Sequence, residues 1–296
     1  MPFIVFNTMQ CVERPTSKQQ VKVKQQVINK KIKKQPKPLE ERITEKQFVD
    51  RLTCSDTRLV EIEEYEQKSD AWLDARKGRI TASNFGAAVG HNKYQSPRGL
   101  LQQMLWRTFK GNKATEWGAK HEPVAFDFYS NYMLLQIINE DGNIPYDTID
   151  CDPEDMLYPT QQMSHVNVVE TGLVVRAPRY WMGNSPDGLV HVTYRDGCRE
   201  TGLLEIKCPA SKRLYPGNGI PKYYMDQIQG TMGNLGLPWC DFVVWTPTKT
   251  KIQRVPFCGK YWDEILLPKL TSFYFDMYVP AAVKKENGDL DEDMIE

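Results

Sequence analysis

The chain has 296 residues, 41% of them hydrophobic, and its 38 basic and 38 acidic side chains give a formal net charge of zero. This length predicts one enzyme-sized domain with extensions. No apolar run approaches the roughly 18 residues that a membrane span needs, and no signal peptide is recognisable. The seven cysteines are scattered and form no C-x-x-C pair, so structural zinc is not expected and a reduced, intracellular compartment is.

The two ends of the chain carry opposite charge. Residues 1–40 are rich in Lys and Gln and predict a basic, disordered arm. Such arms contact nucleic acid or act as nuclear address signals, which favours the nucleus over the cytoplasm, although a solubilising tail explains the composition equally well. Residues 41–68 predict a helical adapter, residues 69–282 the core domain, and residues 283–296 an acidic tail.

The core domain is predicted to begin with a helix over 70–76, which Ser69 caps and Gly78 ends. Ser83 is expected to cap the next helix, whose free N–H groups favour an anion. Arg76 would add a planar fork suited to phosphate. Taken alone, Ser83 is more typical of an ordinary cap and Arg76 of a surface charge.

Two further helices are expected over 97–109 and 114–135. On the second of them Glu122 lies beside apolar positions that we expect in the core, namely Trp117, Val124 and Phe128. A helix carboxylate that faces a sheet edge can reach a metal there. An isolated Glu in this position would more often be exposed to solvent.

The second half of the chain alternates between strands and helices. After a polar loop at 139–160, strand-like runs are found at 172–175, 180–184, 189–194, 203–208, 242–246 and 251–256. Helices are expected over 223–235, which carries Gln227, and over 261–278. The loop between 212 and 221 carries Lys212 and Arg213, which could meet a phosphate backbone. Strands that lie between helices indicate an α/β or α+β fold.

An acidic pair and a lysine are expected to meet on two of these strands. Alternate side chains of a strand share a face, so Glu205 and Lys207 point the same way. The turn signal at 195–197 would pair the two runs and bring Asp187 beside Glu205. Hard divalent cations prefer oxygen ligands, and a lysine can hold a water beside them. This set suits metal-assisted hydrolysis of a phosphodiester.

A structural interpretation competes with this one, because an E-x-K pair on a strand is usually a solvated charge pair. Here the flanking residues are apolar, which indicates a buried strand: Leu203, Leu204, Ile206 and Cys208. Charges in a buried strand are costly unless they are paired or bind a metal. The sequence therefore favours a site.

Five stretches occur in the order found in the phage lambda exonuclease family, also called the YqaJ viral recombinase family, of the PD-(D/E)XK nucleases. They are Gly78-x-Ile80-Thr81-Ala82-Ser83, Trp117-Gly118-x-x-x-Glu122, Ser185-Pro186-Asp187-Gly188, Glu205-x-Lys207-Cys208-Pro209 and Tyr224-Met225-x-Gln227-x-Gln229. The chain resembles this family over about residues 69–260. The resemblance implies a central mixed, twisted sheet flanked by helices, with Mg²⁺ (or Mn²⁺ in its place) at the edge of the sheet.

The resemblance also implies a role for each matching residue. Asp187 and Glu205 match the metal-binding acids, with the Ile206 carbonyl as a further ligand. Lys207 matches the lysine that positions the attacking water, Glu122 the helix acid that supports the metal, and Gln227 the glutamine beside it. The positions that bind the 5′-phosphate correspond to Arg76, Ser83 and Ser185.

The function implied is degradation of one strand of duplex DNA from a 5′ end, which leaves single strand for a partner annealing protein. A trimer is a further implication, and the basic arm suggests a eukaryotic virus or a virus-derived element. Two alternatives stay open: a structure-selective endonuclease of the same superfamily, and a catalytically inactive DNA-binding scaffold. An iron–sulfur relative is disfavoured because the cysteines are well spread.

Overall fold

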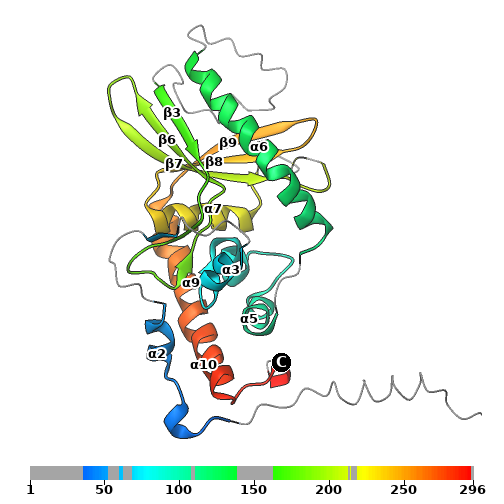
Figure 1. The fold of residues 1–296 in the computed structure, drawn as a ribbon, viewed down its shortest axis with the longest axis vertical. Coiled ribbons are helices and arrows are strands. Elements are labelled where there is room, and N and C mark those ends of the chain that lie inside the picture. The colour runs from blue at the N-terminus through cyan, green and yellow to red at the C-terminus, as the bar shows by residue number, and fades with distance from the viewer. Residues whose placement is uncertain are drawn as a thin grey trace, which may run out of the picture.

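A mixed five-stranded sheet forms the centre of the computed structural model (Figure 1). Its strands, in spatial order, are β3 (Met163–Val169), β6 (Gly188–Tyr194), β7 (Arg199–Lys207), β8 (Trp239–Trp245) and β9 (Thr250–Pro256). Neighbours are antiparallel except for β7 and β8, which run parallel. The structure describes residues 36–52, 60–62, 69–107, 111–138, 163–212, 214 and 219–294.

One helix covers each face of the sheet. Helix α6 (Lys113–Ile138) packs through Ala125, Tyr129 and Met133 against the face that carries Leu204 and Val243. Helix α7 (Lys222–Leu235) packs through buried side chains against the face that carries Leu203 and Phe242. Since β7 and β8 are parallel, the chain must cross over between them, and α7 is that crossover. The expected mixed sheet flanked by helices is confirmed.

The buried side of α6 differs from the expected one. Val124 is 50% exposed, and Trp117 and Phe128 are half-buried, whereas Ala125 and Tyr129 are fully buried. The expectation that the first three form the core was wrong for Val124. The buried side of the helix is centred one residue further along than expected, on Ala125 and not on Val124. Neighbouring positions on a helix are only about 100° apart, so a few apolar residues do not decide which of them faces the core.

A layer of helices lies beyond α7 (Figure 1). It contains α3 (Asp70–Arg76), α4 (Phe85–Ala88), α5 (Pro97–Trp106) and an unbroken helical run over Gly259–Asn287. Two glycines of α7 allow this layer to approach. A Cβ on Gly230 would lie 2.3 Å from the Phe85 ring, and one on Gly233 would lie 2.3 Å from the Trp262 ring.

The long C-terminal run alternates between α and π turns: α8 (Gly259–Tyr261), η5 (Trp262–Leu266), α9 (Leu267–Ser272), η6 (Phe273–Tyr278) and α10 (Val279–Asn287). Each π segment ends two residues before a proline, Pro268 or Pro280. Proline lacks the N–H donor and its ring clashes with the carbonyl four residues back, so the regular ladder is interrupted there. The expected closing helix over 261–278 is therefore present and extends further.

Four short strands complete the fold. β1 (Val60–Ile62) pairs with β4 (Leu173–Val175), and β2 (Ile80–Thr81) pairs with β5 (Met182–Gly183). The segment at 41–68 was expected to be helical, but its described part contains one short helix, α2 (Glu45–Asp50), and strand β1. Residues 1–35 of the arm predicted over 1–40, and the loop at 139–160, lie outside the described residues; the end of the arm enters a 3₁₀ turn at Leu39–Glu41.

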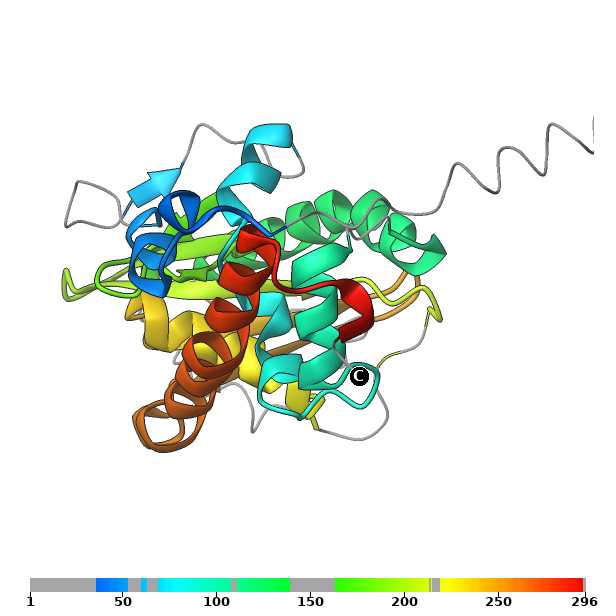
Figure 2. The ribbon, with the colours of Figure 1, turned by 90° about the horizontal axis from the view of Figure 1, so that it is seen from below.

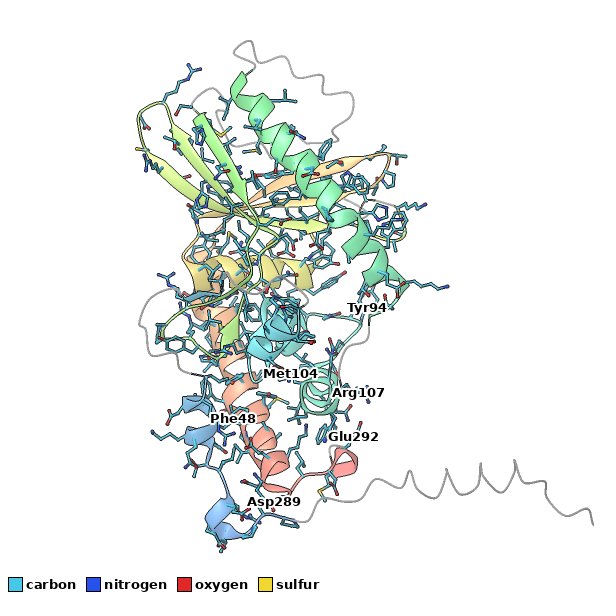
Figure 3. The ribbon with its side chains drawn as sticks, viewed as in Figure 1. Phe48, Tyr94, Met104, Arg107, Asp289 and Glu292 are labelled. Carbon is cyan, nitrogen blue, oxygen red and sulfur yellow. The ribbon has the colours of Figure 1, made fainter. Side chains whose placement is uncertain are left out.

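The segment around α2 packs against the C-terminal helix α10 and the residues that follow it (Figure 2). Arg42 pairs with Asp289 at 2.9 Å and Arg51 pairs with Glu286 at 2.8 Å. Figure 3 shows Phe48 on α2, whose ring meets that of Tyr278 at 6.1 Å. Short 3₁₀ turns flank these contacts at η1 (Leu39–Glu41) and η7 (Glu292–Met294). No helix in the described ranges is long and apolar enough to cross a membrane.

Candidate active site at the edge of the sheet

The strand directions bring the acidic residues to one edge of the sheet. β7 ends at Lys207, and β6 starts at the same edge because Gly188 lies opposite Leu204 in the antiparallel register. Asp187, which immediately precedes Gly188, therefore comes beside Glu205, as the sequence predicts. The Asp187 Oδ2 accepts a hydrogen bond from the Ile206 backbone N–H at 2.6 Å, which fixes its carboxylate against β7.

Glu205 is the most buried of these acids, with 2% of its surface exposed. The Lys207 ammonium pairs with its Oε1 atom, which confirms that the two side chains share a face. Gln227 of α7 donates from Nε2 to the same Oε1 at 2.5 Å. One strand residue, Lys207, and one helix residue, Gln227, therefore hold this carboxylate in a fixed position.

The electrostatics of the site show that the acids repel one another. Burial raises the pKa of Glu205 to about 7; the Lys207 charge opposes this rise, and the charges of Asp187 and Glu122 add to it. Burial lowers the pKa of Lys207, but the charges of Glu205 and Asp187 outweigh burial, so the net shift is upward. Burial, with Glu122 and Asp187, raises the pKa of the neighbouring Cys208 thiol to about 12. We call Glu122, Asp187 and Glu205 the acid cluster.

The acid cluster suits a hard divalent cation by its chemistry. Carboxylate oxygens are the ligands that such cations prefer, and a cation offsets the mutual repulsion that raises the pKa of Glu205. As the side chains stand, no group of three or more His, Cys, Asp or Glu in the described part of the chain is arranged to hold a metal ion. The metal roles of Asp187, Glu205, Glu122 and the Ile206 carbonyl therefore stay predictions.

A second polar cluster gathers around Arg76 at the end of α3. Its Nη1 donates to the Ser185 hydroxyl at 3.4 Å and its Nη2 to the Thr81 hydroxyl at 3.2 Å. The Ser83 hydroxyl lies 3.5 Å from that of Thr81. The structure thus brings together the three residues that the sequence predicts, and adds Thr81. Ser83 lies inside the turn Ala82–Asn84 and does not cap a helix, contrary to expectation. We call Arg76, Thr81, Ser83 and Ser185 the Arg76 cluster.

The Arg76 guanidinium is half-buried and has no carboxylate beside it among the described residues. Burial lowers its pKa to about 10, and no acid among the described residues forms an ion pair with it. The guanidinium lies 3.9 Å from the centre of the Trp72 ring. Two neighbours keep buried polar atoms that have no hydrogen-bond partner within the described residues: Trp72 Nε1 and both side-chain polar atoms of Asn184. An anion-binding site needs such groups: hydroxyls, a guanidinium that no carboxylate neutralises, and polar atoms that still lack a hydrogen-bond partner.

The two clusters are joined by three consecutive residues. Ser185 accepts from Arg76, Asp187 accepts from the Ile206 N–H, and Pro186 lies between them. The Pro186 carbonyl accepts a hydrogen bond from the Thr171 hydroxyl at 3.1 Å. A rigid connection therefore sets the spacing between the cationic and the anionic cluster.

The predicted DNA-binding loop is only partly described. Lys212 has φ +54°, is exposed, and its ammonium lies 4.8 Å from the centre of the Trp117 ring on α6. Arg213 lies outside the described residues. Trp72, Thr81 and Asn184 were missed as site residues. Thr81 could have been found because it falls inside the quoted Gly78–Ser83 stretch, but nothing in the sequence marks Asn184.

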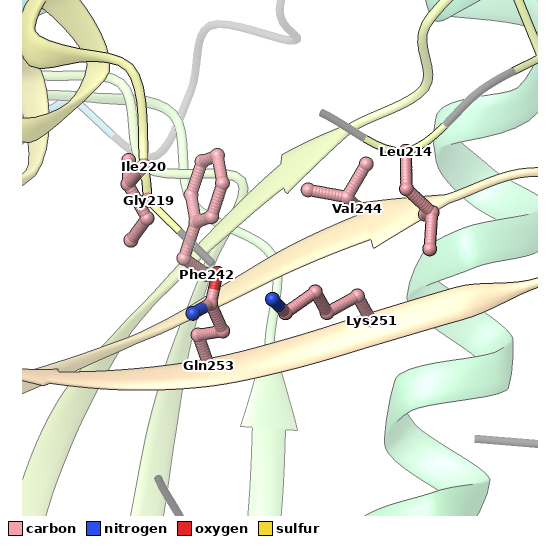
Figure 4. Close-up of a pocket in the computed structure, with 7 residues that line it drawn as sticks. All are labelled: Leu214, Gly219, Ile220, Phe242, Val244, Lys251 and Gln253. Atoms are coloured by element: carbon pink, nitrogen blue, oxygen red, sulfur yellow. The ribbon is translucent and has the colours of Figure 1, made fainter. Parts of the chain in front are cut away.

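A small pocket opens on the α7 side of β8 and β9 (Figure 4). It is lined by Leu214, Gly219, Ile220, Phe242, Val244, Lys251 and Gln253. Phe242 lies opposite Glu205 and Val244 opposite Lys207, so the pocket shares their face of the sheet. Lys251 is the one charged side chain in this lining. The pocket therefore adds a positive charge, and no further carboxylate, to this face of the sheet.

Comparisons with known proteins identify sequence relatives. A family profile described as the YqaJ-like viral recombinase domain matches residues 71–236. A protein of African swine fever virus is 26% identical over 184 residues, which are 55% of this chain and 45% of that protein. An uncharacterized protein of Acanthamoeba polyphaga mimivirus is 26% identical over 209 residues, 67% of this chain and 32% of that protein. The match therefore spans less than half the length of these relatives.

Among solved structures, the crystal structure of an alkaline exonuclease from Laribacter hongkongensis is similar, with a TM-score of 0.49 and 22% sequence identity. It covers 74% of this chain and 96% of its own.

Proposed function

Because the chain belongs to the family of YqaJ-like viral recombinase domains, we propose that it is a metal-dependent nuclease that hydrolyses phosphodiester bonds at the ends of duplex DNA. The supporting observation is the pair of clusters joined through Ser185–Asp187. One is anionic and suits a cation, and the other is cationic and suits a phosphate. A strand end with its terminal phosphate and a divalent cation supplies both missing charges.

Each residue of the acid cluster has a part in the proposed hydrolysis. Asp187 and Glu205 hold Mg²⁺ or Mn²⁺, with the Ile206 carbonyl and Glu122 as predicted supports. A cation held there supplies the positive charge that activates water and offsets charge on the phosphate. Lys207 lies against Glu205 and orients the attacking water through its ammonium protons. Gln227 keeps the Glu205 carboxylate in its orientation by donating to Oε1.

The Arg76 cluster gives the reaction its direction. Arg76, Ser83 and Ser185 hold the phosphate at the 5′ end, so cleavage proceeds from 5′ to 3′ and leaves the other strand single. That single strand is the substrate of an annealing protein in the recombination reaction that we propose. Because contacts go to phosphates and not to base edges, cleavage shows little sequence preference and strong salt sensitivity.

The decisive experiment is digestion of linear duplexes that carry either a 5′-phosphate or a 5′-hydroxyl, with and without Mg²⁺. We expect nucleotide release only with the metal and faster release from the phosphorylated end. A closed circular duplex should stay intact, whereas nicking of it would indicate an endonuclease instead.

A matched pair of variants assigns the activity to the site. Glu205→Ala should bind the duplex and fail to cleave it. Glu200→Ala removes the same side chain five residues earlier on β7, where it accepts from Tyr194 and Trp239, and should retain cleavage. Equal cleavage by Glu205→Ala and wild type would refute the assignment, and absence of any chelator-sensitive release would indicate a binding scaffold.

A further inference from the structure

A column of aromatic rings lies at the active edge of the sheet and has no part in the proposed hydrolysis. The ring of Trp117 stacks on that of His121 one turn later on α6, with centroids 3.8 Å apart and planes 28° apart. His121 in turn lies 5.6 Å from the ring of Trp245, with planes 25° apart. We call Trp117, His121 and Trp245 the aromatic column. All three side chains are half-buried, so the column meets solvent.

The column stands beside the acid cluster. Trp245 ends β8, which is parallel to β7, so it reaches the same edge of the sheet as Lys207. His121 is followed in the chain by Glu122, whose charge acts on Glu205. A Cβ on Gly118, next to Trp117, would lie 3.9 Å from the Cys208 carbonyl oxygen, just beyond the end of β7. The column and the acid cluster therefore share one edge of the sheet, with Trp245 on the face that α6 covers and Glu205 on the face that α7 covers.

The rings are held in place, and one cation covers the outermost ring. His121 Nδ1 lies 2.8 Å from the Trp117 carbonyl oxygen; since a carbonyl only accepts, this nitrogen carries the proton and fixes the ring. The exposed Lys212 places its ammonium 4.8 Å from the centre of the Trp117 ring. A pre-ordered aromatic surface with an adjacent cation is the arrangement by which proteins bind unpaired nucleobases and their phosphates.

We propose that the aromatic column is a nucleobase-binding site, in which an unpaired base at the DNA end stacks on Trp117 in place of the Lys212 ammonium. The ammonium then moves to the phosphate of that nucleotide. This inference rests on the proposed function and names the part of the substrate that it engages. A cation over an exposed ring changes affinity by about 2- to 5-fold, whereas a stacked base contributes roughly 5- to 150-fold. The exchange of ammonium for base is therefore favourable.

The test combines single abasic sites in the DNA with a matched pair of variants. Duplexes with a short unpaired end carry one abasic site at successive positions, and binding is measured in a chelator so that nothing is cut. In the wild type we expect one position at which loss of the base weakens binding by at least about 5-fold. Trp117→Leu should weaken binding of intact DNA by a similar factor and lose the position dependence.

Trp106→Leu is the control, because Trp106 is also half-buried and also carries a lysine ammonium, that of Lys285, 5.7 Å from its ring centre, but lies on α5. It should keep the wild-type profile. Lys212→Gln should weaken all positions alike and reduce the salt dependence of binding.

Two results would overturn the inference: wild-type affinity that stays within 2-fold at every abasic position, or a Trp117→Leu protein that keeps the wild-type profile. Either result leaves metal-dependent digestion of linear duplexes untouched, so the proposed function survives it. Failure to bind intact DNA in any form overturns both.

Discussion

The acid cluster and the Arg76 cluster are electrostatic opposites built into one edge of the molecule. Glu205 is a buried carboxylate whose pKa is raised to about 7, and Arg76 is a half-buried guanidinium whose pKa is lowered to about 10. Both shifts come first from burial, which disfavours a charge of either sign. Arg254 and Asp241 show the contrast, since this half-buried cation pairs directly with this buried anion.

The contrast indicates that the two clusters are incomplete without ligands, whereas Arg254 and Asp241 form a finished structural pair. A charge that is buried without a full partner costs folding free energy, and a ligand that supplies the partner recovers it. The predictions below test whether the acid cluster lacks a cation and the Arg76 cluster lacks an anion.

The largest effect is expected for Glu205→Gln, which keeps the shape of the side chain and removes its charge. Cleavage should fall by at least about 10³-fold, because the stabilisation that a cation offers the transition state is worth several kcal/mol. Initial rates on a linear duplex measure it. Affinity for that duplex, measured in chelator, should change little. Glu200→Gln on the same strand should leave the rate near that of the wild type.

Next in size is the loss of end discrimination in Arg76→Gln. The ratio of rates on 5′-phosphorylated and 5′-hydroxyl duplexes should fall by about 10- to 100-fold, because hydrogen bonds to a charged group are worth about 1.5–3 kcal/mol. Arg254→Gln removes a half-buried arginine that pairs with the buried Asp241; it should lower thermal stability and leave the ratio unchanged. An unchanged ratio in Arg76→Gln would place the 5′-phosphate elsewhere.

The stability of the metal-free protein should depend on pH through Glu205. Folding raises the pKa of this group from 4.5 to about 7, so the folded state retains a proton that the unfolded chain releases. The contribution of Glu205 to stability should therefore fall as pH rises from about 4.5 to about 7 and stay constant above. In chelator, the melting temperature of the wild type should therefore fall relative to that of Glu205→Gln as pH rises through this range. Parallel curves would argue against a raised pKa.

The smallest effects are expected when Mg²⁺ or phosphate is added alone and changes the thermal stability of the protein. At ten times its dissociation constant, either Mg²⁺ or inorganic phosphate should stabilise the wild type by about 1.4 kcal/mol. Mg²⁺ should lose its effect in Glu205→Gln and keep it in Arg76→Gln, and phosphate should show the reverse. Thermal denaturation of the three proteins with each ion measures this crossed pattern, and a phosphate effect that survives Arg76→Gln would break it.

The sequence predicts those parts of the site whose arrangement depends only on local geometry, namely on one strand and one turn. Strand alternation places Glu205 and Lys207 on one face, and the turn at 195–197 fixes the pairing that brings Asp187 alongside. Gly197 takes φ +86°, which glycine adopts readily. The alternation of side chains along a strand and the position of one turn were therefore enough to predict where these three side chains lie.

Other features depend on tertiary packing that no short stretch encodes. Strand β3 was missed because Ser164, His165 and Asn167 interrupt its apolar positions, and its pairing with β6 decides its structure. The exposed side of Val124 and the role of Asn184 likewise depend on which neighbours pack there. The metal arrangement of the acid cluster also belongs here, because side-chain positions at a site respond to the ligand.

Ser185, Pro186 and Asp187 set the distance between the Arg76 cluster and the acid cluster. The ring of Pro186 restricts the backbone, and the bond from Thr171 restrains it further. These restraints hold the separation between the two clusters nearly constant. In the proposed nuclease, every turnover should therefore release a fragment of the same size, whatever the sequence of the DNA.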